Sequence, residues 1–234
     1  MCGRFNSIAS GKDFAEVYGA EFLGVDLPAN HNVAPTALVH VLSQFESRRL
    51  VETMTWGLVP SWSKDKTRSA SMINARSETL FEKPSFRNLV NKYRCVIPIQ
   101  GFYEWQVLPS DSKKPRKQAH YISRSDGQVM TLAGLWTTWN SPDNSELKTC
   151  TIITIEATNK LGEIHHRMPV ILERMNIDAW LDNDASLPQD LLKVAPDEVV
   201  MSQPTNRLDR PSRSKIPDDS VSFKLNDDSS GRLF

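Results

Sequence analysis

The fold class is decided by the stretch Arg94-Cys95-Val96-Ile97-Pro98-Ile99-Gln100-Gly101-Phe102-Tyr103-Glu104-Trp105. Two runs of strand length, Arg94–Ile99 and Phe102–Val107, lie on either side of a glycine. Both runs are rich in β-branched or aromatic residues, which strands favour, and a glycine between two such runs is typical of a break between elements. The stretch therefore predicts two consecutive strands.

Similar runs recur along the chain, most of them bounded by Gly, Pro, Asn or Ser clusters. They are Ala37–Phe45, Leu50–Trp56, His120–Arg124, Val129–Leu135, Cys150–Ile155 and Val170–Leu172. Helical patterns are short and fall at Asp13–Leu23, Ser85–Tyr93, Asn159–Ile164, Asn176–Asp182 and Leu187–Val194. Many short strands with occasional helices predict an α+β fold: a single domain around a curled, mostly antiparallel, barrel-like β-sheet with short peripheral helices.

Length and composition also favour one soluble globular domain. The chain has 234 residues, of which 39% are hydrophobic, and this share is too high for a disordered chain. We expect the domain to span residues 2–203. After about Thr205 the composition shifts to Arg, Asp, Ser and Pro, which predicts a partly disordered tail over 204–234.

Several classes of protein are excluded on the same grounds. No run approaches the ~18 apolar residues of a membrane span, and the first residues lack an apolar signal segment. The chain contains three cysteines (Cys2, Cys95 and Cys150) but no C-x-x-C pair, which predicts reduced thiols and no zinc site. There is no dinucleotide or P-loop motif, so we expect no nucleotide cofactor. The 28 basic and 28 acidic residues cancel, so only local patches can argue for a nucleic-acid partner.

Cys2 is the first residue with distinctive chemistry. Methionine before a small residue is usually removed, so we expect a mature chain that begins with Cys2. Its α-amine would titrate near ~7.7–8.0 and its thiol near ~8.5. An aldehyde can condense with this amine, and the thiol can then capture the imine as a five-membered thiazolidine, a ring closure favoured by proximity. The alternative is that a cysteine at this position is incidental.

Two further groups suit proton transfer. Glu104 lies in an apolar and aromatic run; in a cleft, desolvation would raise its pKa toward neutrality, whereas on the polar side of a strand it would only face solvent. His165, His166 and Arg167 precede a predicted strand. Imidazole titrates near ~6.5 and suits proton transfer, and a guanidinium suits a phosphate. The alternative for the histidine pair is a plain loop.

A third group suits DNA. Asn74 and Arg76, together with Arg4 near the start of the chain, offer donors for adjacent phosphates. Trp56 and Trp62 come before the stretch Asp65–Arg94, which is locally basic. Aromatic rings interleaved with basic residues are typical of single-strand binding, in which each stacked base contributes roughly 1–3 kcal/mol. Core packing of both tryptophans is the alternative.

Six motifs occur in the order of one known family. They are Cys2-Gly3-Arg4-Phe5, Asn32-Val33-Ala34-Pro35, Trp56-Gly57-Leu58-Val59-Pro60, Ile73-Asn74-Ala75-Arg76, Gly101-Phe102-Tyr103-Glu104-Trp105 and His165-His166-Arg167-Met168-Pro169. Over roughly residues 2–203 the sequence closely resembles the SRAP family, the SOS response-associated peptidases, which act as abasic-site processing proteins. The resemblance implies a single α+β domain around a curled antiparallel sheet. It also implies a DNA-repair function without a cofactor: covalent capture of abasic sites in single-stranded DNA, often at a junction with duplex.

The resemblance further implies roles for the catalytic candidates. Cys2 would be the nucleophile that forms the thiazolidine crosslink with the aldehyde of the opened sugar. Glu104 would be the general acid/base in crosslink formation and reversal. His165 matches the family histidine that assists ring opening and imine formation, while His166 falls at a variable position. Asn74 would help to orient the terminal cysteine.

DNA contacts are implied by the same resemblance. The residues that match phosphate-contacting or strand-holding positions are Arg4, Asn74, Arg76 and Arg167, with Trp105 and Thr154 as weaker candidates. Pro35 and Trp62 match a wedge that separates the abasic nucleotide from its neighbouring bases. Some relatives carry a second tryptophan where this chain has Ser63, so the stacking surface is expected to be smaller.

Two other functions remain open. One is an N-terminal-nucleophile cysteine hydrolase in which Glu104 or His165 is the base. The other is a non-covalent single-strand-binding module in which Cys2 is incidental. In the family, the peptidase name reflects the freeing of Cys2. Only Met1 precedes Cys2 here, so broad protein-cleaving activity is not expected. We expect a monomer in the cytoplasm, associated with the nucleoid in a bacterium, or in the nucleus of a eukaryote.

Overall fold

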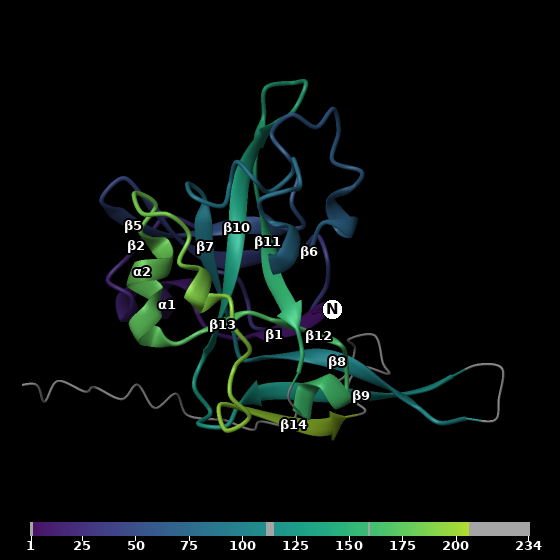
Figure 1. Cartoon of the computed structure of the whole chain (residues 1–234). Coiled ribbons are helices and arrows are strands. Elements are labelled where there is room, and N and C mark those ends of the chain that lie inside the picture. The colour runs from purple at the N-terminus through teal and green to yellow at the C-terminus, as the bar shows by residue number, and fades with distance from the viewer. Residues whose placement is uncertain (1, 111–114, 159, 206–234) are drawn as a thin grey trace, which may run out of the picture.

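The computed structural model describes residues 2–110, 115–158 and 160–205, so the tail predicted over 204–234 lies outside the described residues from position 206 onward. The described residues form fourteen strands, two α-helices and five 3-10 helices, arranged around two sheets (Figure 1). The strands are β1 (Arg4–Ser7), β2 (Glu21–Phe22), β3 (Asn30–Val33), β4 (Leu38–Phe45), β5 (Arg48–Trp56), β6 (Asn74–Arg76), β7 (Arg94–Ile99), β8 (Gly101–Leu108), β9 (Arg116–Arg124), β10 (Met130–Asn140), β11 (Glu146–Glu156), β12 (Arg167–Pro169), β13 (Ile171–Leu172) and β14 (Val200–Thr205). The helices are α1 (Gly11–Val17), α2 (Ile177–Leu181), η1 (Ser69–Ser71), η2 (Ser77–Thr79), η3 (Lys160–Glu163), η4 (Arg174–Asn176) and η5 (Gln189–Leu191).

Five strands of the larger sheet close into a barrel. They follow the order β5-β4-β7-β10-β11, and β11 then pairs with β5 in parallel. The other four pairings around this ring are antiparallel. β2 lies beside β5, β6 and β12 lie beside β11, and β13 lies beside β10. The predicted curled, mostly antiparallel sheet with short helices is confirmed.

Strand β7 is buried on both faces, and this explains its continuous apolar sequence. Cys95, Ile97 and Ile99 join a core cluster that includes Phe5 of the second sheet. The alternate residue Val96 joins the other cluster, where α2 packs against the barrel. A strand with two buried faces has no polar side to show, so its sequence does not alternate.

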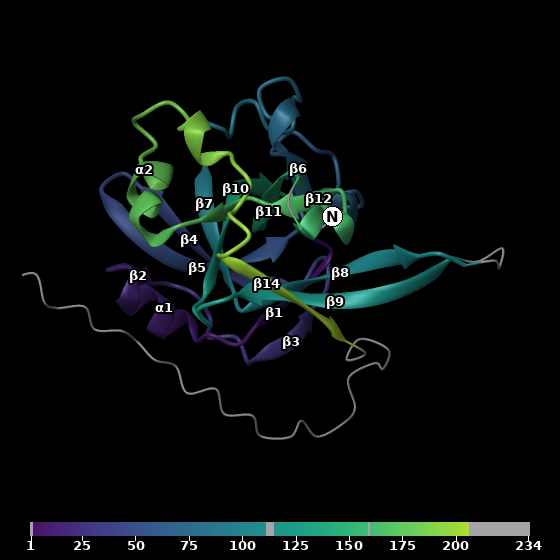
Figure 2. The same ribbon diagram turned by 60° about the horizontal axis from the view of Figure 1, so that its bottom comes forward.

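The second sheet positions the start of the chain. Its order is β14-β9-β8-β1-β3, and the β8–β9 hairpin projects from the body as a long arm (Figures 1 and 2). β1 pairs antiparallel with β8, with Arg4 opposite Tyr103 and Phe5 opposite Phe102. The residues that precede β1 therefore lie beside the middle of β8. β1 and β3 were not predicted, because each is short and largely polar.

Helix α2 agrees with the predicted segment Asn176–Asp182, whereas the other helix predictions need correction. The first helix ends at Val17, because Gly19 has a φ of +59° that a right-handed helix cannot continue, and the chain enters β2 at Glu21. Within the segments 160–164 and 187–194, only the 3-10 helices η3 and η5 form.

No helix forms over Ser85–Tyr93, where the chain makes successive turns instead. The apolar residues of this segment are drawn into the core by tertiary contacts, with Phe86 and Val90 buried against the barrel. The Val90 carbonyl accepts from Nη1 of the fully buried Arg94 at 2.9 Å. Tertiary packing and this side-chain bond thus override a weak helical pattern.

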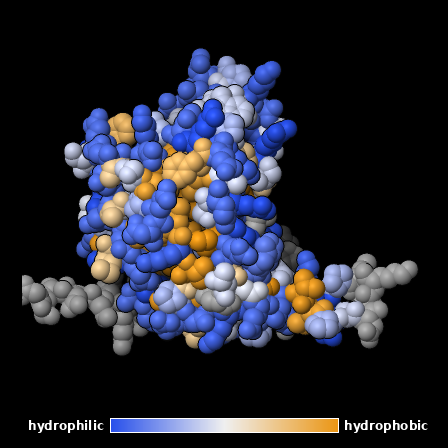
Figure 3. Space-filling model, in the orientation of Figure 1, coloured by the Kyte–Doolittle hydropathy of each residue, from blue (hydrophilic) through white to orange (hydrophobic). Residues whose placement is uncertain are grey.

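Polar side chains cover most of the surface on the side shown in Figure 3, around an apolar band at its centre. Among the described residues, no helix is long and apolar enough to cross a membrane. The same residues contain no group of three or more His, Cys, Asp or Glu side chains placed to hold a metal ion.

Candidate active site

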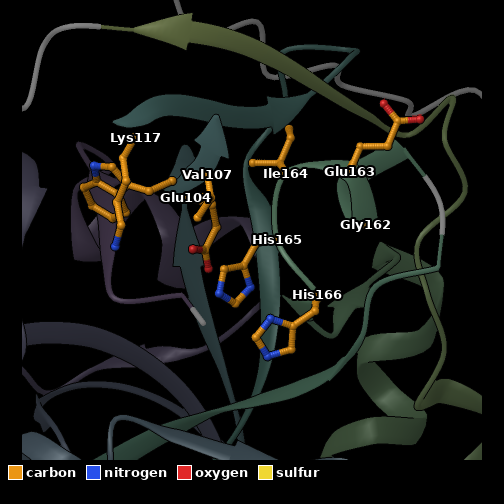
Figure 4. Close-up of a pocket in the computed structure, with 9 residues that line it drawn as sticks. Glu104, Val107, Lys117, Gly162, Glu163, Ile164, His165 and His166 are labelled. Atoms are coloured by element: carbon orange, nitrogen blue, oxygen red, sulfur yellow. The ribbon is translucent and has the colours of Figure 1, made fainter. Parts of the chain in front are cut away.

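A cavity of about 590 Å³ lies between β8 and the segment that follows η3. Its lining residues are Glu104, Trp105, Val107, Lys117, Gly162, Glu163, Ile164, His165 and His166 (Figure 4). Glu104 comes from β8, Lys117 from β9, and the two histidines from the loop that leads into β12. The cavity thus joins two motifs that lie about sixty residues apart in the chain, and Figure 4 shows the Glu104 carboxylate directed toward the His165 ring.

Cys2 is completely buried, and it lies close enough to the cavity residue Glu104 for the two groups to interact electrostatically. It belongs to the core cluster that includes Phe5 and Trp56, and it is a free thiol. Asn74 of β6 donates from Nδ2 to the Cys2 carbonyl oxygen at 2.9 Å, which fixes the backbone of the residue. Burial raises the pKa of the Cys2 thiol, and the nearby negative charge of Glu104 raises it further. The thiol is therefore protonated at neutral pH and needs a proton acceptor before it can act as a nucleophile.

Glu104 faces the cavity and not open solvent. Only 3% of the residue is exposed, and burial raises the pKa of its carboxyl group. The alternative in which Glu104 sits on the polar side of an exposed strand is therefore wrong. A buried carboxyl group with a raised pKa keeps its proton to higher pH than an exposed one, which favours a role as general acid/base.

His165 is held beside the Arg167 backbone as a neutral imidazole. Its Nδ1 lies 3.0 Å from the Arg167 backbone nitrogen and 3.2 Å from the Arg167 carbonyl oxygen, so these contacts are compatible with either tautomer. Burial lowers the pKa of His165 from its ordinary value to about 4. The exposed His166 ring stacks on the His165 ring, with centroids 4.4 Å apart. His165 is therefore a neutral imidazole in the same cavity as Glu104 at physiological pH.

Asn74 and Arg76 lie on the same side of β6, because their positions differ by two. Arg76 is exposed, whereas Asn74 is half-buried and reaches Cys2. Arg4, on the neighbouring sheet, donates from Nη1 to Oδ1 of Asn32 at 3.2 Å. The structure thus brings Asn74 to Cys2 and leaves Arg76 open to a ligand. Phosphate binding by Arg4 and Arg76 stays a prediction.

Arg167 is buried and engaged by other protein groups. Its Nη1 and Nη2 donate to the two carboxylate oxygens of Glu78 at 2.7 and 3.0 Å, and Nη2 also donates to the Thr154 carbonyl oxygen at 2.6 Å. Thr154 is itself fully buried. Sequence reasoning assigned no role to Glu78, because a pair that spans 89 positions leaves no local signal. DNA contacts by Arg167 and Thr154 stay predictions.

The two tryptophans of the predicted single-strand surface differ. Trp56 is completely buried and donates from Nε1 to the Ile73 carbonyl at 3.0 Å, so core packing holds for this residue. Trp62 is 66% exposed, and Pro35 lies half-buried in the turn before β4. The wedge role of Trp62 and Pro35 stays a prediction. Trp105 is half-buried and lines the cavity, and its contact with DNA stays a prediction.

The arrangement can carry out acid–base chemistry on a small electrophile. It combines a buried thiol, a carboxyl group with a raised pKa and a neutral imidazole. The cavity lining also includes the exposed residues Val107 and His166. An exposed arginine on β6 lies on the strand that also supplies Asn74. These features fit an electrophile attached to an anionic chain.

Comparisons with known proteins identify the family of this chain. The family model described as SOS response associated peptidase (SRAP) matches residues 1–208. An abasic site processing protein of Bacillus subtilis, YoqW, is 38% identical over 82% of this chain and 87% of its own length. The abasic site processing protein HMCES of Gallus gallus is 32% identical over 76% of this chain and 59% of its own length. A solved protein from Bacteroides thetaiotaomicron superposes with a TM-score of 0.78 at 27% identity, covering 87% of this chain and 91% of that chain. The chain belongs to the SRAP family.

Proposed function

We propose that this chain processes abasic sites in single-stranded DNA by linking them covalently to Cys2. The observation that supports this most directly is the fixed position of Cys2: its carbonyl is held by Asn74, and its thiol lies within the electrostatic reach of Glu104. The relatives named as abasic site processing proteins support the same substrate. The functional unit is the domain over residues 2–203, acting as a monomer.

The reaction begins with an abasic sugar that opens to an aldehyde. His165 donates a hydrogen bond to the ring oxygen as the C1–O4 bond of the sugar breaks. The proton of the C1 hydroxyl passes to that oxygen, which leaves an aldehyde at C1 and a hydroxyl at C4. The α-amine of Cys2 then attacks the aldehyde carbon, and the resulting carbinolamine loses one water to give an imine. Glu104 protonates the hydroxyl that leaves as this water, and the nitrogen then returns its proton to the Glu104 carboxylate.

Ring closure follows from the same residue. The Cys2 sulfur adds to the imine carbon, the thiol proton passes through Glu104 to the nitrogen, and a thiazolidine results. The net change is the loss of one water from aldehyde plus aminothiol. Because amine and thiol sit on adjacent carbons, this closure has a high effective concentration. Reversal runs the same proton transfers backward, again through Glu104.

DNA is held by groups around this centre. Arg4, Arg76 and Arg167 contact backbone phosphates, with weaker contributions from Trp105 and Thr154. Pro35 and the exposed ring of Trp62 separate the abasic nucleotide from its neighbours. A single strand, whose bases are already unstacked, fits this mode of binding.

The test uses an oligonucleotide with one abasic site. We expect an adduct that survives SDS, with intact mass equal to the des-Met1 protein plus DNA minus one water. Cys2→Ala should abolish it, while a tetrahydrofuran lesion, which lacks the aldehyde, should give none with the unmodified protein. An adduct formed equally well by Cys2→Ala would overturn the proposal. Turnover of peptides without DNA would support the cysteine hydrolase instead.

A further inference from the structure

The ion pair between Arg167 and Glu78 is asymmetric in its exposure to solvent. The Arg167 side chain is 9% exposed, whereas the Glu78 side chain is 48% exposed. Glu78 sits in η2, immediately after β6, and covers the arginine from the solvent side. A ligand that approaches Arg167 from solvent therefore meets the Glu78 carboxylate first.

The geometry of the pair is that of anion recognition. Two nitrogens of the guanidinium donate to two oxygens of one carboxylate, at 2.7 and 3.0 Å. A planar guanidinium takes a carboxylate or a phosphate in the same two-pronged way. The other Arg167 contacts hold the side chain from behind, through the Thr154 carbonyl oxygen at 2.6 Å. Arg167 is thus a fixed anion site whose outer face is occupied by a carboxylate.

A second cation lies next to this site. Arg76 is exposed two residues before Glu78, and it pairs in register with Thr154, the residue that supports Arg167. No salt bridge joins Arg76 to a carboxylate among the residues that the structure describes. The buried Arg167 Nε atom likewise finds no hydrogen-bond partner there. Two arginines with unused donors therefore flank one negatively charged side chain.

We propose that Glu78 occupies the place of a DNA phosphate on Arg167 in the free protein, and that a bound strand displaces it. The inference rests on the proposed function, because it takes the DNA backbone as the ligand of Arg167. Its consequence is regulatory. Every strand that binds must first break a bidentate ion pair, so non-specific binding to undamaged single strands is weakened while covalent capture at a lesion still goes to completion.

The experiment measures non-covalent binding, so it uses Cys2→Ala protein and a short undamaged oligothymidylate. Fluorescence anisotropy measures the affinity for this oligonucleotide at salt concentrations between 50 and 200 mM. Three proteins are compared: the Cys2→Ala protein itself, and the same protein with Glu78→Gln or with Glu82→Gln. Glu82 is an exposed neighbour on the same loop, so its variant makes the same charge change without freeing Arg167. We expect Glu78→Gln to bind about fivefold to tenfold tighter, with a salt slope steeper by about 0.7. Glu82→Gln should give a much smaller gain in affinity and a much smaller change in the salt slope.

A double variant, Glu78→Gln with Arg167→Ala, should lose the gain in affinity that Glu78→Gln gives alone. If Glu78→Gln lowers the melting temperature strongly, Glu78→Asp, which keeps the charge on a shorter side chain, should bind with intermediate affinity. Equal effects of Glu78→Gln and Glu82→Gln, weaker binding by Glu78→Gln, or no binding by any variant would overturn the inference. These outcomes do not depend on the aldehyde: an adduct with Cys2 can form while this inference fails, and tighter strand binding can appear while no adduct forms.

Discussion

At the scale of single residues, Glu104 is the group on which the proposed chemistry depends most. Glu104→Gln keeps the shape of the side chain and removes its ability to exchange a proton. We expect crosslinking to slow by roughly a hundredfold or more, as for loss of a general acid/base. DNA affinity should stay near that of the unmodified protein, because Glu104 faces the cavity and not the backbone contacts.

Glu163→Gln is the matched control, because Glu163 lines the same cavity but is exposed. Adduct yield against time on an abasic oligonucleotide measures both variants. If Glu104→Gln formed adduct at the normal rate, or if it failed to fold by thermal melting, the carboxyl group would have a structural role only.

His165 adds a pH dependence to stability. Its pKa is about 4 in the folded protein, against about 6.5 in an unfolded chain. Between these two values the unfolded state binds more protons, so stability must fall as the pH decreases from 6.5 to 4. Discounted for screening at a half-exposed site, the loss is about 1 kcal/mol, or roughly 2–4 °C in melting temperature. His165→Gln should show a correspondingly smaller drop between pH 7 and pH 4.5, and an unchanged drop would assign the acid sensitivity to other groups.

At the scale of elements, strand β8 holds the loop that carries His165. Gln106 donates from Nε2 to the Glu163 carbonyl oxygen at 3.1 Å, and its Oε1 lies 3.2 Å from Nε2 of His120. The other ring nitrogen of His120 lies 3.0 Å from Ser202 Oγ. This chain of bonds connects β14, β9 and β8 to η3, and so fixes the segment just before the histidine.

Gln106→Ala should therefore slow crosslinking several-fold without changing DNA affinity, because it loosens the loop before His165. Gln118→Ala is the control, since Gln118 lies directly opposite Gln106 on β9 but, within the described part of the chain, donates to the backbone oxygens of Ala119 and Thr205 and not to the loop before His165. The measurement is the rate at which each variant forms the adduct on an abasic oligonucleotide. Equal slowing would show that the hairpin as a whole, and not this bond, supports the site.

The elements that could be predicted from sequence are those whose own residues show a strand or helix pattern. β7 and β8 are apolar along most of their length, and α2 has a clear helical pattern, so all three agree with expectation. β1 and β3 are short, and they exist because each finds a partner far away in the chain. In the same way, the motifs identified Glu104 and His165 as candidates. The Glu78 ion pair and the Gln106 bonds join distant segments and could not be predicted.

At the scale of the whole molecule, closure of the barrel is what places β6 and the Trp62 loop. β5 ends where it pairs with β11, and Gly57 follows at once, donating its N–H to the Cys150 carbonyl at 2.8 Å. From this corner the chain leaves the barrel toward Trp62 and returns at Asn74, beside β11. The same corner therefore supports both the predicted wedge and the residue that holds Cys2.

Gly57 fits this corner because it has no side chain. Its φ is +138°, and a Cβ added there would lie 2.6 Å from the Ser69 carbonyl oxygen. Gly57→Ala should therefore cost about 2–4 kcal/mol, since backbone strain and overpacking add. Gly127 provides the control, with a φ of +72° and no atom within 4 Å of an added Cβ, so Gly127→Ala should cost only about 1 kcal/mol. Urea denaturation of the two variants measures the difference. Equal losses would mean that Ser69 moves aside freely, and the corner would then not fix the loop that carries Trp62.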